Sequence, residues 1–344
     1  MVAVTGPRDL SPRDAWKRYV DRRRTELTDG SADSYHYRLK LFGAWCEDRG
    51  IETVSELNGW LLDEYRAHRA GEGIASTTLH NEMETLRGLV EYLENIGAVE
   101  DGLSKKVDVP RVPEDEQSRE TKLATDDALE ILRFHRSNDE TYGSLFHAFL
   151  EVAWHTGARL GALRGLDLRD FDRDVGYVEF VHRPETGTPL KNKRKGERMV
   201  KLLPEVVDVV DAYIAGDRRS NHDEHGRQPL FTSTRGRPGR NTVRVWSYRA
   251  TMPCVFGPCP HGHDPDDCEF RSHTHASKCP SSRAPHHIRT GAITWHQDRG
   301  IPKEVTAERV NASQRVIDRH YDVATKLEEM ELRRGPHMDK LSLD

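Results

Sequence analysis

The sequence predicts a mainly α-helical protein with a small β-sheet, divided into two domains. Three observations lead to this prediction. Apolar residues recur at helical spacing along most of the chain, β-rich runs occur only between residues 172 and 203, and a charged, proline-containing segment interrupts the pattern at 106–122. A chain of 344 residues has room for two domains, each with its own core.

Residues 8–105 are expected to form a helical bundle. Ser11 is placed to cap the first helix, and Pro12 follows where the first turn tolerates proline. Three further helical segments are expected at residues 31–48, 57–69 and 76–96. Four helices in so short a stretch predict a compact bundle.

Residues 106–122 predict an exposed linker, because they are rich in charge and poor in large apolar side chains. The second domain is expected over residues 123–335. Its predicted elements are helices at 126–136, 142–155 and 204–215, strands at 177–181 and 198–203 joined by a basic hairpin, a Cys/His-rich insertion at 253–280, and helices from residue 286 onward.

The bulk composition indicates a soluble protein. Charged residues make up 32% of the chain, mean hydropathy is −0.77, and no apolar run is long enough to span a membrane. The N-terminus has no signal-peptide pattern, so we expect a cytoplasmic protein. The net charge of −5 argues mildly against DNA as a ligand, although a basic groove can form on an acidic protein. The excess of 39 Arg over 13 Lys, with many acids, is typical of salt-adapted proteins.

Four separate stretches carry groups suited to phosphodiester transfer. Such a reaction needs a nucleophile, positive donors for the non-bridging phosphate oxygens, and a proton for the departing oxygen. Arg159 lies in the stretch 155–167, a lysine-rich hairpin follows at 190–202, and His286 and Arg289 lie one helical turn apart. Tyr321 lies in the fourth stretch, where a phenol could store the bond energy as a phosphotyrosine, so that rejoining needs no ATP.

Taken in this order, the four stretches resemble the catalytic domain of tyrosine recombinases, the family of phage integrases and chromosome-dimer resolvases. The resemblance covers residues 122 to 330, and the N-terminal bundle more loosely resembles that family's core-binding domain. The arginine-rich, acidic composition and the cysteine insertion are most similar to archaeal members, in particular those of salt-loving species. The resemblance implies a DNA-breaking-rejoining fold and site-specific strand exchange through a 3′-phosphotyrosine.

The resemblance also implies a role for each matching residue. Arg159 and Arg289 match the two arginines of the phosphate clamp, and His286 matches the proton-transfer partner of the nucleophile, Tyr321. Lys193 matches the hairpin lysine that protonates the leaving oxygen, by its offset before Arg198. The neighbours of that lysine, Lys191 and Lys195, remain rivals for the same role.

Two positions depart from the family's pattern. The position of the usual second histidine, counted back from Tyr321, is Ala312, with Asn311 beside it. Asn311 could donate a hydrogen bond to phosphate but cannot transfer a proton at neutral pH. Ala162 stands where many members have a glutamate that supports the first arginine. The charged neighbours of Tyr321 further suggest that this tyrosine is not fully buried.

The Cys/His-rich insertion predicts a structural zinc ion. Its four cysteines are spaced C-x4-C-x8-C-x10-C, with four histidines between them, and irregular sequence of this kind could hardly fold without a metal as its core. Four free thiols are the alternative. The predicted ligands are Cys254, Cys259, Cys268 and Cys279, or three of these cysteines and one of the histidines.

Double-stranded DNA and a tetramer of this chain on paired sites are the partners that the resemblance implies, with no membrane partner. Three other functions remain open: a DNA-binding relative without catalysis, a type IB topoisomerase that relaxes supercoils, and a zinc-dependent hydrolase built on residues 254–279. The first is disfavoured because the Arg, Lys, His, Arg and Tyr positions of the four stretches are all filled.

Overall fold

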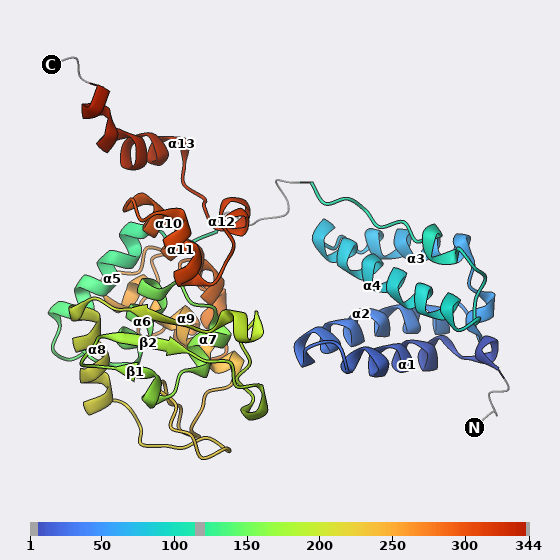
Figure 1. Cartoon of the computed structure of the whole chain (residues 1–344), viewed down its shortest axis with the longest axis horizontal. Coiled ribbons are helices and arrows are strands. Elements are labelled where there is room, and N and C mark those ends of the chain that lie inside the picture. The colour runs from blue at the N-terminus through green and yellow to red at the C-terminus, as the bar shows by residue number, and fades with distance from the viewer. Residues whose placement is uncertain (1–5, 114–120, 342–344) are drawn as a thin grey trace. The chain divides into compact units, whose positions relative to one another are not determined.

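The computed structural model describes residues 6–113 and 121–341 and divides the chain into two compact units, residues 1–118 and 119–344. The predicted fold class is confirmed, because both units are mainly helical and the second contains one small antiparallel sheet (Figure 1). The predicted linker, 106–122, lies partly outside the described residues.

The first unit is a helical bundle around an aromatic core. Its helices are α1 (Pro12–Arg24), α2 (Asp29–Asp48), α3 (Gly59–Gly71) and α4 (Ser76–Asn95). The hydroxyl of Ser11 accepts a hydrogen bond from the N–H of Asp14 at 3.1 Å, as expected for a capping serine. Phe42, Trp45 and Tyr65 are buried in the core, with ring centroids 5.1 to 6.3 Å apart.

The second unit packs helices around one hydrophobic core that includes Phe149 and Trp154. Its helices are α5 (Thr125–Ser137), α6 (Leu145–Thr156), α7 (Leu160–Gly165), α8 (Pro204–Ala215), α9 (Arg240–Ala250), α10 (Pro285–Asp298), α11 (Lys303–Val310), α12 (Gln314–His320) and α13 (Lys326–Glu328). A π-helical turn, Glu329–Arg334, and a 3-10 turn, Gly335–Leu341, follow α13.

The sheet has the strand order β1 (Phe171–Asp172), β2 (Tyr177–Phe180), β3 (Arg198–Lys201), and both pairings are antiparallel. Val178 pairs with Val200, and Phe180 pairs with Arg198. The long connection between β2 and β3 is the basic hairpin, which contains a 3-10 turn, Lys193–Gly196. The sheet thus presents the lysine-rich segment at one of its ends.

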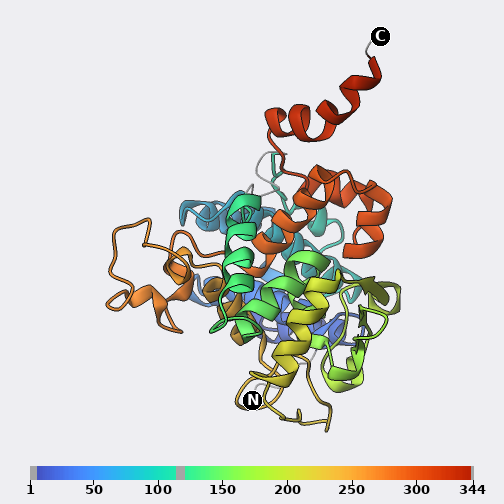
Figure 2. The same cartoon turned by 90° about the vertical axis from the view of Figure 1, so that its left-hand side faces the viewer.

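The Cys/His-rich segment between α9 and α10 has little regular structure beyond short 3-10 turns, and it projects from its unit as a loop, drawn in orange in Figure 2. A small apolar cluster of Met252, Ala276 and Cys279 lies in this region, and Phe256 packs against the main core of the unit. In the part of the chain that the structure describes, no helix is long and apolar enough to cross a membrane.

Candidate active site

Tyr321 lies directly after α12 and is buried, with 5% of its surface exposed. Its ring packs with Ile293, Val310 and Ile317, and its backbone oxygen accepts a hydrogen bond from the hydroxyl of Thr294 at 2.9 Å. The expectation that Tyr321 is not fully buried is therefore wrong. The polar residues just before it, Asp318 to His320, are exposed or partly buried. Their polar character therefore did not indicate how deeply the tyrosine is buried.

Arg289 and His286 both face Tyr321 from α10. The guanidinium carbon of Arg289 lies 4.7 Å from the centre of the Tyr321 ring, and the His286 ring centroid lies 5.3 Å from it. Arg289 is 1% exposed, and its Nη1 donates to the carbonyls of Gly157 at 2.6 Å and Val310 at 2.8 Å. Its Nε and Nη2 are buried without a hydrogen-bond partner among the described residues, which leaves two donors for a ligand.

Arg159 reaches the same place from the turn between α6 and α7. Gly157 ends α6 with φ +56°, the left-handed conformation that favours glycine, and this turn directs the chain so that Arg159 precedes α7. The Nη1 of Arg159 donates to the carbonyl of Asn311 at 2.7 Å. Arg159 and Arg289 are therefore anchored on consecutive carbonyls at the end of α11.

A third arginine, Arg198, joins these two, although the sequence analysis used it only as a reference for the hairpin lysine. Its Nε donates to the carbonyl of Arg309 at 2.7 Å, and its guanidinium lies 4.2 Å from the ring centre of Phe180, its β-sheet partner. The carbonyls of residues 309, 310 and 311 thus accept from three arginines of three different segments. The C-terminal carbonyls of a helix lack helical partners and carry partial negative charge, which suits guanidinium groups.

Arg309 itself completes what we call the carbonyl-held cluster: Arg159, Arg198, Arg289 and Arg309. The guanidinium of Arg309 donates to the carbonyl of His155 at 2.9 and 3.0 Å. Within residues 6–113 and 121–341, no ion pair joins a member of this cluster to a carboxylate. Its positive charge is offset only by backbone dipoles.

The pKa values in the cluster reflect this lack of negative charge. Burial, and then the charges of Arg289, Arg159 and Arg309, lower the pKa of Arg198 to about 9. Burial also lowers the pKa of Arg289 to about 10; Tyr321 opposes this shift and Arg159 adds to it. Both side chains remain charged at neutral pH, so the site suits an anion.

His286 is kept neutral by the same surroundings. Partial desolvation, followed by the charges of Arg289, His287 and Arg159, lowers its pKa from the usual value. A neutral imidazole beside a phenol can accept the proton of that phenol.

The hairpin lysines are not in contact with the buried arginines. Lys191, Lys193 and Lys195 are all exposed, so the geometry does not choose among them. Lys193 alone of the three has a positive φ, +53°. Two side-chain hydrogen bonds connect the hairpin to the site: the Nδ2 of Asn192 donates to the Oδ1 of Asn311 at 2.9 Å, and the Nη1 of Arg198 donates to the carbonyl of Gly196 at 3.0 Å.

The two departures from the family pattern have structural counterparts. Asn311 ends α11 with φ +52°, a conformation that asparagine tolerates better than most residues, whereas Ala312 packs against the apolar cluster around Tyr321. Ala162 is buried and carries no charge. For Arg159, the anchor in this structure is the backbone oxygen of Asn311.

The four cysteines predicted to bind zinc do not form a metal site in the structure. Among the described residues, no group of three or more His, Cys, Asp or Glu side chains is placed to hold a metal ion. Cys259 and Cys279 lie near enough to Cys254 to contribute to raising the pKa of its thiol, after burial. The described residues thus bring some of the predicted zinc ligands near one another but do not assemble a complete set.

Comparisons with known proteins agree with this fold. No family model matches the chain. The tyrosine recombinase XerC of Stutzerimonas stutzeri is 28% identical over 168 residues, which is 49% of this chain and 54% of XerC. The chain therefore matches about half the length of such curated relatives.

Two solved structures extend the comparison. The Tn1549 transposon integrase, solved in complex with a circular intermediate DNA, is 13% identical with a TM-score of 0.66, covering 97% of this chain and all of that chain. The N-terminal domain of a phage integrase/site-specific recombinase from Haloarcula marismortui is 46% identical over 29% of this chain and 97% of its own, with a TM-score of 0.29.

The fold is thus that of integrases with a helical first unit and a mixed second unit. The chain belongs to the tyrosine recombinase and phage integrase family.

Proposed function

We propose that this protein is a site-specific DNA recombinase that cuts and rejoins double-stranded DNA through Tyr321. The observation that carries the proposal is the buried phenol beside a neutral imidazole and the carbonyl-held cluster, which has no carboxylate partner in the described part of the chain. A DNA backbone phosphate is an anion that this charge would bind, and guanidinium groups suit its oxygens.

The proposed reaction is an exchange of one phosphodiester for another. The Tyr321 oxygen attacks phosphorus and passes its proton to His286, while Arg159 and Arg289 hold the non-bridging oxygens, where charge develops. The bond to the 5′ oxygen breaks, and that oxygen leaves with a proton from Lys193. The reverse attack, by the 5′ hydroxyl of another strand, rejoins the DNA without ATP.

A covalent trap tests the proposal. Duplexes with a randomised core and a nick beside it are incubated with the protein, and adducts that survive denaturation are recovered and sequenced. The nick lets the cut fragment diffuse away, so a 3′-phosphotyrosine accumulates. We expect adducts with the wild type and with Tyr142→Phe, a matched control on the surface, and none with Tyr321→Phe.

The same experiment separates the other functions. Adducts that persist in Tyr321→Phe contradict the proposed nucleophile. DNA binding without any adduct indicates an inactive DNA-binding relative. Relaxation of supercoiled plasmid without a recovered core sequence indicates a topoisomerase, and activity that a chelator abolishes indicates the zinc hydrolase.

Assembly of four protomers on two paired sites belongs to the same proposal. The segment after residue 325 exposes apolar side chains that could pack on a neighbouring protomer: Leu327, Met330, Leu332 and Met338. The same segment reaches the nucleophile, because Arg333 pairs with Asp322, next to Tyr321, and with Asp298 of α10. Truncation after Thr325 is expected to weaken assembly on DNA and strand exchange; unchanged values for both would contradict this role.

The zinc ion at Cys254, Cys259, Cys268 and Cys279 stays a separate prediction. The archaeal origin of the protein also stays a prediction. The proximity of Cys254 to Cys259 and Cys279 is the observation in favour of a metal. Elemental analysis of the purified protein tests it, with Cys46→Ser as the control, since Cys46 is buried in the first unit. Equal metal content in wild type and Cys259→Ser would rule out the site.

A further inference from the structure

We infer that Asn311 and Asn192 are positioning residues that align the hairpin lysine with the arginine clamp; this inference rests on the proposed function. Asn311 uses both of its oxygens to hold other parts of the site. Its backbone oxygen accepts from Arg159, and its side-chain oxygen accepts from Asn192, the residue directly before Lys193. One residue thus connects two groups that act on the same phosphate.

The hairpin is shaped to receive the Asn311 side chain. A Cβ atom added to Gly196 would lie 2.6 Å from the Nδ2 of Asn311, so a larger residue there would displace the amide from its observed position. Gly196 is buried although the three lysines of the hairpin are exposed. The amide of Asn311 therefore sits against the inner side of the turn that carries Lys193.

Unusual backbone conformations occur on both sides of the hydrogen bond between Asn192 and Asn311. Among the described residues, Lys193 and Asn311 are the non-glycine residues with positive φ, at +53° and +52°. This conformation costs a residue with a side chain roughly 1–2 kcal/mol, so surrounding contacts must maintain it. Asn192, beside Lys193, provides such a contact through its side chain, and the backbone N–H of Lys193 donates to the carbonyl of Leu190 within the hairpin.

The chemistry explains why such a connection matters. A general acid must lie within hydrogen-bond distance of the leaving oxygen while the clamp holds the phosphate, and small displacements reduce the rate strongly. An exposed lysine on an exposed turn has many accessible positions. A hydrogen bond from the preceding residue to the anchor of Arg159 restricts them.

The alternative role of Asn311 is direct donation to a phosphate oxygen in place of the missing histidine. The two roles predict different responses to the leaving group. A sulfur atom at the bridging 5′ position leaves as a thiolate and needs no protonation, because thiols are much more acidic than alcohols. Sulfur therefore removes the need for a placed acid and leaves the need for a stabilised phosphate unchanged.

The test compares single-turnover cleavage of an oxygen and a 5′-bridging sulfur duplex that carry the core sequence recovered by covalent capture. Asn311→Gly keeps the left-handed backbone and the carbonyl that accepts from Arg159, and removes only the amide. We expect Asn311→Gly and Asn192→Ala to cut the oxygen duplex about 10- to 100-fold more slowly, the range of a misplaced acid. Both should cut the sulfur duplex within about threefold of wild type, and the double variant should be no slower than either single variant.

Two further variants give the reference patterns. Lys193→Ala should behave as the asparagine variants do, and Arg159→Ala should be slow on both duplexes. If Asn311→Gly remains slow on sulfur, Asn311 acts on the phosphate and the positioning role is overturned; if Lys193→Ala is not rescued, the hairpin holds no acid at Lys193 and the inference also fails. Absence of any Tyr321 adduct from the wild type contradicts the proposed function instead.

Hydrogen exchange gives a second measurement that needs no activity. In the full-length protein, both asparagine variants should increase amide exchange in residues 191–197 and leave α6 and α10 unchanged. Unaltered exchange in the hairpin would show that the asparagine contact does not hold it, and would overturn the inference whatever the cleavage rates.

Discussion

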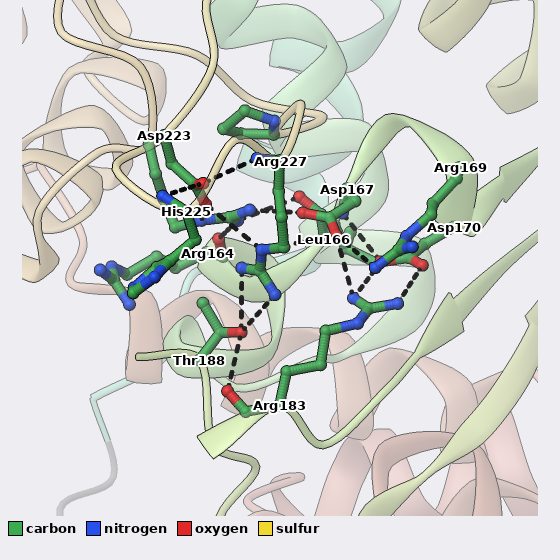
Figure 3. Close-up of polar contacts among 12 residues, drawn as sticks. Arg164, Leu166, Asp167, Arg169, Asp170, Arg183, Thr188, Asp223, His225 and Arg227 are labelled. Atoms are coloured by element: carbon green, nitrogen blue, oxygen red, sulfur yellow. Dashed lines mark hydrogen bonds and ion pairs between the residues drawn. The ribbon is translucent and has the colours of Figure 1, made fainter. Parts of the chain in front are cut away.

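The second unit contains two groups of buried or partly buried arginines whose positive charges are balanced in different ways. We call the first the carboxylate-paired cluster: Arg183, Arg227 and Arg237 with Asp167, Asp170 and Asp223, most of which Figure 3 shows. There each guanidinium meets at least one carboxylate. In the carbonyl-held cluster, the guanidinium groups donate to backbone oxygens, and none of them pairs with a carboxylate of the described residues.

The presence or absence of carboxylate partners distinguishes arginines that stabilise the fold from arginines that are available to bind a ligand. Asp167 is 1% exposed and contacts all three arginines of its cluster, so the charges there offset one another within the fold. Burial alone would raise the pKa of Asp223, but Arg237 and the backbone N–H groups of Arg227 and His225 hold it at about 2. The carbonyl-held cluster lacks such negative partners, so it is suited to bind an anionic ligand.

The largest predicted effect falls on stability, in the carboxylate-paired cluster. Asp167→Asn leaves three buried guanidinium groups with less negative charge, and removing one partner of such a network costs about 3–5 kcal/mol. We expect a loss of this size in the free energy of unfolding from denaturant melts. Arg169→Ala, which removes an exposed arginine 3.5 Å from the same aspartate, should cost under about 1 kcal/mol. Equal losses in the two variants would contradict the comparison.

The carbonyl-held cluster should show the reverse pattern. Arg289→Ala removes a clamp donor and is expected to slow formation of the Tyr321 adduct about 10²- to 10³-fold, the usual cost of one charge-stabilising donor. The free energy of unfolding should change little, because the substitution also removes an unpaired buried charge. A stability loss as large as that of Asp167→Asn, with adduct formation unchanged, would show that Arg289 is a structural residue.

This contrast also explains which parts of the molecule the sequence could predict. Helix ends follow local rules, so the cap at Ser11 and the end of α6 at Gly157 were predictable from single residues. The four stretches were recognisable because their order along the chain is specific. Arg198 was missed as a site residue because its importance comes from a carbonyl more than 100 residues away. The burial of Tyr321 was mispredicted for a similar reason, since α10 and α11 cover it from elsewhere in the chain.

An anion should stabilise one cluster and not the other. Inorganic phosphate that binds only the folded state raises the free energy of unfolding, by about 2.7 kcal/mol at a hundredfold excess over its dissociation constant. We expect phosphate to raise the melting temperature above that in sodium chloride of equal ionic strength. The increase should shrink in Arg198→Ala and persist in Arg169→Ala. An equal increase in both variants would indicate a general salt effect.

The smallest predicted effect concerns acid. His296, near Arg309, is 2% exposed, and its pKa is lowered to about 3 by burial and then by the charges of Arg309 and His155. Its folded pKa lies below the ordinary value of 6.5, so the unfolded chain takes up the proton first as the pH falls. The stability that neutral His296 contributes is therefore complete above pH 6.5 and is lost progressively as the pH falls from 6.5 toward 3. Asp223 also has a lowered pKa, but its contribution is lost only below about pH 4, as the pH approaches 2.

Because His296 and Asp223 lose their contributions over different pH ranges, the pH dependence of stability can separate the two residues. Between pH 7.5 and 5.5, protonation of the unfolded state at position 296 should reduce the free energy of unfolding by about 1 kcal/mol. His296→Gln should lose that part of the slope whatever its stability at neutral pH, because glutamine does not titrate. Asp223→Asn should keep the slope, since Asp223 stays ionised in both states over this range. A slope that disappears in Asp223→Asn and persists in His296→Gln would mean that the carboxylate-paired cluster, and not His296 beside Arg309, causes the loss of stability in this pH range.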